Sequence, residues 1–265
     1  MFLTMLPTWQ AAILIVGVPT ILAVMGPFVV RRFVGLERLK INNEVAGFKF
    51  STVSVLYAVL LAFVVIVVWQ KFNDADNVVS QEAAAAATIY RISSDLPGDH
   101  GRHLRGALNG YLRAVVEHEF AAMAGGAASS EAKIALDRLY AEFLDINVTA
   151  PGDVVTYSEL LRLLDRVTQL RRARLFASTG VVPAVLWATL IIGALGTLGF
   201  TLFFGSRNIR AQAMMTAVLA VLLFCGLLIV VAFDHPFSGS VRVSSEPLVT
   251  VMEDFRALPA TSPSR

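Results

Sequence analysis

The sequence has almost no cysteine: Cys225 is the single one among 265 residues. An intramolecular disulfide is therefore excluded, and so is a zinc site built from several cysteines. The chain also lacks the G-x-S-x-G, H-E-x-x-H and glycine-rich phosphate-binding patterns that mark common catalytic and nucleotide sites. We therefore expect neither an enzyme nor a bound cofactor.

Charged residues are scarce as well. They make up 16% of the chain, against 56% hydrophobic residues, whereas an ordinary soluble domain has about 25% charged residues. The formal net charge is only +2, so we expect no nucleic-acid partner, because binding to phosphates requires a strongly basic surface. Scarcity of charge instead points to a chain that is partly in lipid.

Four long segments of the chain contain no charged residue. Each is long enough to cross a bilayer as a helix, which takes about 20 apolar residues. We therefore predict an all-α membrane protein whose four transmembrane helices form two pairs. Because no ionisable residue lies in the middle of a span, the sequence disfavours a proton relay but not a passive pore. The uncharged segments are residues 1–30, 50–70, 175–206 and 211–233.

The polar segment between the two pairs cannot lie in lipid. Apolar residues recur in it at helical spacing, which predicts a bundle of amphipathic helices over residues 74–95, 102–123 and 131–146, with a fourth starting at a capping box from Thr156 to Glu159. The predicted domains are a first transmembrane pair (1–72), a helical extramembrane domain (73–174), a second transmembrane pair (175–234) and a polar C-terminal tail (235–265).

Polar clusters in the insert are weak metal candidates. Glu117, His118 and Glu119 are adjacent, so on a helix they point about 100° apart and cannot face one ion together. His100 and His103 lie at a helix start. We expect solvated side chains and no metal site.

Other residues are candidates for a pore. If the second span lines a central axis, Val64, Val65 and Val68 would suit a hydrophobic gate; otherwise they face lipid. Asp74, Asp76 and Glu82 follow this span, either as an acidic ring in an oligomer or as ordinary acids stabilised at a helix N-terminus. The spacing of Gly193, Gly196 and Gly199 fits close helix packing, between subunits or within one.

A series of short motifs resembles the bestrophin-like family of bacterial and plant membrane proteins. The resemblance implies a distant likeness to bestrophins, which are pentameric anion channels with four spans per subunit and a helical cytosolic domain. It implies a homo-oligomer in the cell membrane, the inner membrane in a bacterium, with inorganic ions and the lipid bilayer as partners. The motifs are NEVAGF (43–48), YAVLLAF (57–63), Trp69, FNDA (72–75), QEA (81–83), YR (90–91), LP (96–97), DHPFSG (234–239), VS (243–244) and PL (247–248).

Charged and polar residues of these motifs lie near the span ends. They predict a polar network at the membrane boundary, in which Arg91 pairs with Asp234 in the same subunit or with Glu82 across a subunit boundary; Arg91 could equally reach solvent or lipid phosphate. The candidate network is Asn43, Glu44, Asp74, Glu82, Arg91 and Asp234.

Two arguments disagree about which side of the membrane the helical insert faces. The short connections carry Arg31, Arg32, Arg38, Lys40, Lys49, Arg207 and Arg210, and the positive-inside rule would place them in the cytoplasm and the insert outside. Likeness to bestrophins implies a cytoplasmic insert. We favour the charge rule. For function we expect a passive ion channel, an anion channel by the resemblance; the alternative is a non-conducting membrane sensor or scaffold whose helical insert binds a partner.

Overall fold

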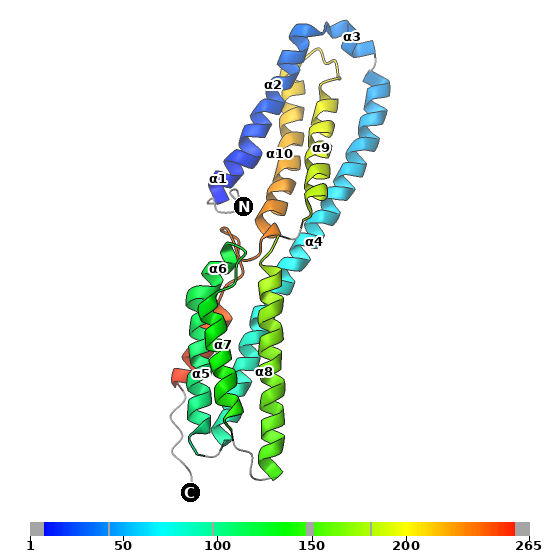
Figure 1. Cartoon of the computed structure of the whole chain (residues 1–265). Helices are drawn as coiled ribbons and strands as arrows, with labels where there is room; N and C mark the ends of the chain where they lie inside the picture. The colour runs from blue at the N-terminus through cyan, green and yellow to red at the C-terminus, as the bar shows by residue number, and fades with distance from the viewer. Residues whose placement is uncertain (1–7, 42, 97, 147–150, 181, 258–265) are drawn as a thin grey trace. The chain divides into compact units, whose positions relative to one another are not determined.

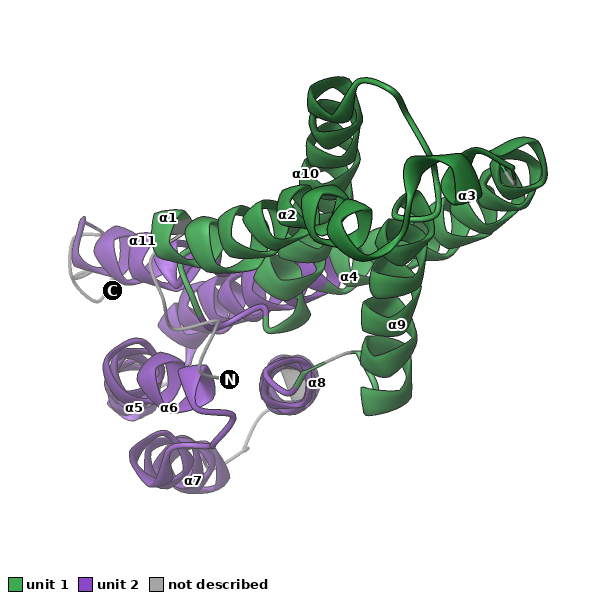
Figure 2. Ribbon diagram, turned by 90° about the horizontal axis from the view of Figure 1, so that it is seen from above, with its two compact units in different colours: residues 1–71, 180–235, 239–241 green, residues 72–179, 236–238, 242–265 purple. Residues whose placement is uncertain are grey.

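The computed structural model describes residues 8–41, 43–96, 98–146, 151–180 and 182–257. Throughout these ranges the regular structure is helical (Figure 1). The chain divides into two compact units, which are coloured separately in Figure 2. Unit 1 comprises residues 1–71, 180–235 and 239–241, and unit 2 comprises residues 72–179, 236–238 and 242–265.

Unit 1 contains the helices that are apolar enough to cross a membrane. By length and composition there are four such helices in the described residues, within Trp9–Phe33, Asn43–Asp95, Ala184–Thr201 and Ile209–Asp234. The elements are α1 (Thr8–Ala12), a π-helix (Ile13–Gly17), α2 (Val18–Phe33), α3 (Leu36–Ile41), the first part of α4 (Asn43–Ile92), α9 (Ala184–Thr201) and α10 (Ile209–Asp234).

The core of unit 1 forms where α4, α9 and α10 meet. Tyr57, Val64 and Val68 of α4 pack with Leu190 of α9 and Val230 of α10. The Tyr57 hydroxyl donates a hydrogen bond to the Leu190 carbonyl at 3.1 Å. Close packing here requires glycine, because a Cβ at position 193 would lie 2.4 Å from the Tyr57 ring. Many other apolar side chains of unit 1 remain exposed, as expected of a surface that faces lipid or another subunit.

Helix α4 is far longer than a membrane span. Its 50 residues correspond to about 75 Å measured along the helix at 1.5 Å per residue, whereas the hydrocarbon layer is about 30 Å thick. The uncharged stretch at 50–70 therefore occupies only part of the helix, which continues without a break into unit 2. The end of the apolar run at Lys71 changes the environment of the helix and does not end it.

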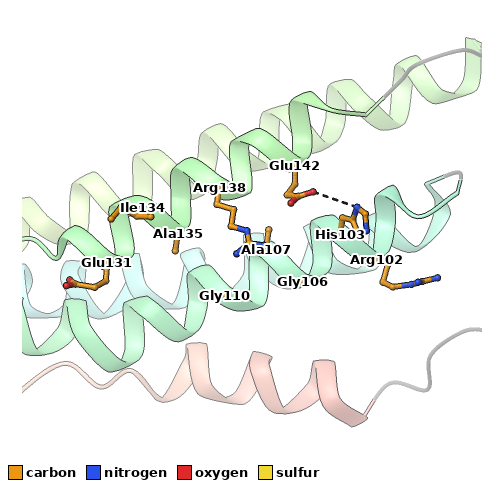
Figure 3. Close-up of a pocket in the computed structure, with 10 residues that line it drawn as sticks. All are labelled: Arg102, His103, Gly106, Ala107, Gly110, Glu131, Ile134, Ala135, Arg138 and Glu142. Carbon is orange, nitrogen blue, oxygen red and sulfur yellow. Dashed lines mark ion pairs between the residues drawn. The ribbon is translucent and has the colours of Figure 1, made fainter.

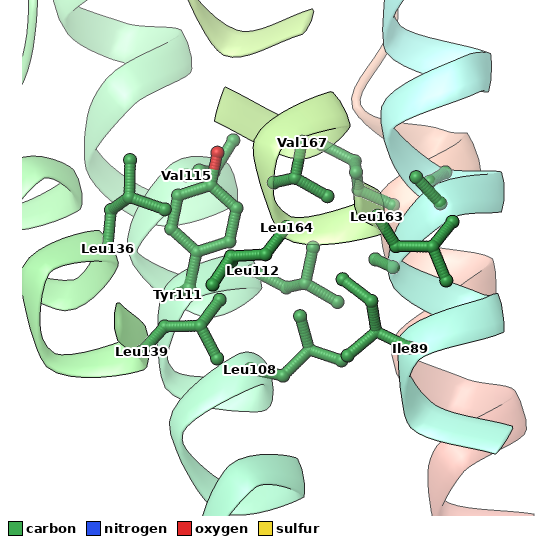
Figure 4. Close-up of a cluster of buried hydrophobic side chains, with 14 of the residues drawn as sticks. Ile89, Leu108, Tyr111, Leu112, Val115, Leu136, Leu139, Leu163, Leu164 and Val167 are labelled. Atoms are coloured by element: carbon green, nitrogen blue, oxygen red, sulfur yellow. The ribbon is translucent and has the colours of Figure 1, made fainter. Parts of the chain in front are cut away.

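Unit 2 is a helical bundle with its own apolar core. Ile89, Leu108, Tyr111, Leu139 and Leu164 meet there from four different helices (Figure 4). Besides the second part of α4, its elements are a 3-10 turn (Ser93–Asp95), α5 (His100–Ala114), a π-helix (Val115–Glu119), α6 (Phe120–Ala124), α7 (Ser130–Leu144), α8 (Pro151–Ala177) and α11 (Glu246–Ala257).

One predicted helix start was wrong, and one helix was not predicted. Helix α8 begins at Pro151, five residues before the predicted capping box, because proline is well tolerated in the first turn of a helix; Thr156 and Glu159 thus lie inside it. The tail, interpreted only as polar, contains α11, whose Leu248, Met252 and Phe255 are buried in the core of unit 2. Its final residues, 258–265, lie outside the described ranges.

Candidate functional site

Unit 2 buries a cluster of charged side chains beside its apolar core. Glu82, Glu119 and Arg174 are 0% exposed, and Arg171 is 8% exposed. They come from three elements that are distant in sequence: α4, the π-helix and α8. Such burial is rare for charged residues unless they are paired, so the cluster is the most unusual chemical feature of this unit.

Arg174 lies between the two carboxylates. Its Nε donates to Glu82 Oε2 at 2.7 Å and its Nη2 to Glu119 Oε2 at 2.8 Å. A second contact joins Nη2 to Glu82 Oε1 at 3.2 Å, and the guanidinium stacks 5.4 Å from the centre of the Phe120 ring. One planar cation thus binds two anions at once, a geometry that lysine cannot provide.

Arg171 completes the charge balance. Its Nε donates to both oxygens of Glu119, at 3.1 and 3.2 Å, and Nη2 also donates to Oε1. Arg171 and Arg174 are three residues apart on α8, so both reach the same face of that helix. Glu119 is the last residue of the Val115–Glu119 π-helix. The wider turn of a π-helix changes the direction in which its side chains point, compared with a regular α-helix.

Tyr111 connects the network to the apolar core. Its hydroxyl donates to Glu82 Oε1 at 2.6 Å. Burial and the neighbouring Glu82 carboxylate raise the pKa of Tyr111 well above its ordinary value. For Arg174, burial alone would lower the pKa, but the charge and hydrogen bonds of Glu82, together with Tyr111 and Glu119, outweigh burial and raise the pKa. The tyrosine therefore stays neutral and the arginine charged, and two carboxylates offset two guanidiniums.

The structure reassigns two predicted interactions of Glu82. Because Glu82 is fully buried and bonded to Arg174 and Tyr111, it cannot join Asp74 and Asp76 in an acidic ring. For the same reason it has no exposed oxygen for Arg91 of another subunit. Asp74, Asp76 and Arg91 are exposed, and the pairing of Arg91 with Asp234 stays a prediction.

The remaining boundary residues belong to unit 1. Asn43 forms a reciprocal pair with the backbone of Gly205: Nδ2 donates to the carbonyl and Oδ1 accepts from the N–H, both at 2.9 Å. Asp234 accepts a hydrogen bond from the Val182 N–H at 2.8 Å. Glu44 is exposed. Asn43 and Asp234 therefore hold chain segments at opposite ends of α10, while Glu44 points outward.

The candidate gate valines differ in exposure. Val64 is 7% and Val68 0% exposed, in the core of unit 1, whereas Val65 is half-buried. The exposed face of α4 lies on the other side and includes Val59, Phe63 and Ile66. A gate formed by this helix remains a prediction, but Val64 and Val68 already pack within their own subunit.

The prediction that Glu117, His118 and Glu119 are solvated was wrong for Glu119. Glu119 is buried against arginines, whereas Glu117 and His118 are exposed. Among the described residues no group of three or more potential metal ligands comes together.

A groove on the surface of unit 2 runs between α5 and α7 (Figure 3). It has a volume of about 770 Å³. Positions 106 and 110 have open space where a side chain would project, and His103 Nδ1 lies 3.9 Å from Glu142 Oε2 at one end. The groove is lined by Arg102, His103, Gly106, Ala107, Gly110, Glu131, Ile134, Ala135, Arg138 and Glu142.

The fold and these sites define an all-helical membrane protein with four membrane-length helices and a helical unit joined to them through α4. The chain belongs to the bestrophin-like family, because the model of the Bestrophin-like domain matches residues 17–248.

Solved structures agree on the fold. A variant of a bacterial bestrophin homologue from Klebsiella pneumoniae has a TM-score of 0.68 at 15% identity, covering 93% of this chain and 99% of that one. A second variant of that homologue has a TM-score of 0.62 at 16% identity, and the match covers 90% of this chain and 94% of that one. A structure described as a membrane protein has a TM-score of 0.69 at 15% identity, and the match covers 94% of this chain and 100% of that one. No curated protein matches the sequence.

Proposed function

We propose that the chain is the subunit of a homo-oligomeric, passive ion channel in the cell membrane, and that it conducts anions. Membership of the bestrophin-like family supports a channel. The observation that carries the proposal is the exposed face of α4. Over residues 50–70 this helix carries no charge, and its exposed side chains there include Val59, Phe63 and Ile66, which suits a hydrophobic gate.

The exposed face repeats at helical spacing. Val59, Phe63 and Ile66 are 49%, 65% and 50% exposed, and they follow one another by four and three residues, which keeps them on one side of the helix. Gln70, Asn77 and Gln81 continue this side as exposed polar residues. In an oligomer with α4 at the axis, we infer that Phe63 and Ile66 form the hydrophobic constriction.

Recording from purified protein in planar bilayers tests conduction. We expect discrete current steps under an applied voltage and, across a chloride gradient, a reversal potential that follows the chloride equilibrium potential. Exposed Asp74 and Asp76 would instead favour cations if they surround the axis, so a reversal potential that follows sodium or potassium would overturn the anion assignment alone. A silent bilayer with correctly assembled protein would contradict the channel.

The position of the constriction has its own test. Phe63→Ser should increase the open-state current or open probability, because a polar ring is wetted more easily than an apolar one. Ala58→Ser is the matched control, since Ala58 is exposed but lies about 140° around the helix. Equal effects of both substitutions would place the pore elsewhere.

The second candidate function is a non-conducting membrane sensor or scaffold, and the groove between α5 and α7 favours it. Its floor lacks side chains at Gly106 and Gly110, and Ile134 on its wall is 67% exposed. These features suit a partner segment that approaches the backbone closely. Binding of a partner by protein that gives no current would select this function over the channel.

A further inference from the structure

Unit 1 contains a cavity at one end of its membrane-spanning helices. Its volume is about 690 Å³. The walls come from the start of α4, the end of α9 and the start of α10. The lining residues are Asn43, Phe50, Thr201, Phe204, Gly205, Ser206, Arg207, Gln212, Met215, Thr216 and Leu219.

The wall nearest the connection between α9 and α10 is built firmly. Asn43 holds Gly205 through two hydrogen bonds of 2.9 Å. A Cβ at position 205 would lie 2.8 Å from the Lys40 backbone nitrogen, so only glycine fits there. Gln212 Nε2 also donates to the Phe204 carbonyl at 2.7 Å. The cavity is therefore a feature of a fixed loop.

The cavity is apolar on one side and polar on the other. Phe50 and Phe204 meet edge-to-face with their ring centres 5.6 Å apart, and Leu219 and the 63% exposed Met215 extend this apolar wall. Thr216 lines the cavity at only 3% exposure, and its hydroxyl forms no hydrogen bond with a described residue. This hydroxyl can donate to or accept from a ligand that carries hydrogen-bonding oxygens.

Unpaired positive charge lies beside the polar side. Arg207 lines the cavity, and Arg31 Nη2 donates to the Arg207 carbonyl at 3.3 Å. Within the described part of the chain, neither arginine forms an ion pair. Among the residues that the structure describes, no carboxylate lines the cavity. Positive charge without an acidic partner attracts an anionic group, and arginine matches phosphate particularly well.

We propose that this cavity binds an anionic phospholipid. Its phosphate lies on Arg207, beside Arg31, and its glycerol or ester oxygens bond to Thr216. One acyl chain lies along Phe50, Phe204, Met215 and Leu219. The ligand reaches the site from the bilayer itself, because the cavity is formed by the ends of membrane-spanning helices. This inference goes beyond the proposed channel and does not depend on conduction.

Native mass spectrometry of the purified oligomer tests the site. The probes are phosphatidylglycerol and phosphatidylcholine with identical acyl chains. We expect phosphatidylglycerol to be retained in preference, and Arg207→Gln to weaken its binding about fivefold, the factor for loss of one basic contact with an anionic lipid. Arg210→Gln is the matched control, because Arg210 is exposed in the first turn of α10, three residues after Arg207, and does not line the cavity.

A second pair of variants tests the acyl site. Leu219→Trp should fill the cavity and reduce retention of the lipid, whereas Val218→Trp, at the adjacent 58% exposed position outside the cavity, should not. An unchanged thermal unfolding midpoint of the oligomer shows that each variant folds. If Leu219→Trp does not fold, Arg207→Gln alone tests the site.

Several results would overturn the proposal. Equal retention of the two lipids, or equal losses in Arg207→Gln and Arg210→Gln, would show general surface attraction only. Equally strong binding of soluble glycerol phosphate would identify a free phosphate compound as the ligand. A cryo-EM map in which a neighbouring subunit fills the cavity would also refute it.

Discussion

Arg174 and Glu82 are 92 residues apart in the sequence and form an ion pair of 2.7 Å with no exposed surface on either side chain. The pair joins α8 to α4, the helix that runs on into the membrane unit. Isolated burial of either charge would cost several kcal/mol. The network must therefore form as a whole, and it fixes the rotation of both helices about their axes.

Breaking this pair should destabilise the protein strongly. Arg174→Ala leaves Glu82 buried without its cation, and we expect a loss of about 3–5 kcal/mol in the free energy of unfolding. Thermal unfolding in detergent measures it as a large fall in midpoint. Arg172→Ala is the control, because Arg172 is exposed two residues earlier on α8. Similar midpoints for the two variants would contradict a central role for the network.

The Tyr111 hydroxyl should make stability depend on alkaline pH. Burial and Glu82 raise the pKa of Tyr111 in the folded chain, whereas an unfolded tyrosine titrates near pH 10. Above about pH 10 the unfolded chain loses this proton and the folded chain keeps it, so stability falls as the pH rises. Tyr111→Phe should make the free energy of unfolding fall less steeply between about pH 10 and 11. Denaturant unfolding at a series of pH values measures this slope. An unchanged slope would show that Tyr111 ionises freely in the folded state.

Substitutions of two glycines in α9 should have different effects, one on the stability of the subunit and one on its assembly. A Cβ at Gly193 would lie 2.4 Å from the Tyr57 ring, whereas at Gly196 it meets nothing within 4 Å. We expect Gly193→Leu to lower the stability of the subunit, because the Tyr57 ring must move. Gly196→Leu should lower the oligomeric state in mild detergent if this exposed position lies at a subunit contact, which size-exclusion chromatography with light scattering measures.

The two glycine variants control for one another. Interhelical contacts in lipid are worth only about 1–2 kcal/mol each in model peptides, so Gly196→Leu should weaken assembly without abolishing it. An unchanged oligomer in Gly196→Leu would place this part of α9 against lipid.

Asn43 should be needed in its amide form. Its side chain both donates to and accepts from the Gly205 backbone. Asn43→Asp keeps the acceptor but lacks the donor, so it leaves the Gly205 carbonyl unpaired. We expect both Asn43→Asp and Asn43→Ala to lower the free energy of unfolding by about 1–3 kcal/mol. Ser206→Ala, on the same loop, should have little effect in the same thermal assay; full stability of Asn43→Asp would refute the reciprocal pair.

The sequence by itself determined the membrane class and the family. Residues 1–30, 50–70, 175–206 and 211–233 are uncharged because charge is costly in lipid, and this signal is local. Helical periodicity likewise indicated the bundle of the insert. Helix boundaries were less accurate: α8 starts earlier than its capping box, and α11 was missed because a short amphipathic helix gives a weak signal without its packing partner.

Only the tertiary structure decided which charges are paired. A signal was present: Arg171 and Arg174 continue the buried stripe of Leu160, Leu164 and Val167 at spacings of four and three residues, and Glu82 lies between the buried Val79 and Ala86. Spacing shows that a charge lies on a buried face, but it cannot identify a partner 92 residues away. Pairing requires the helices to meet, so Glu82 and Arg174 find each other only in the packed bundle.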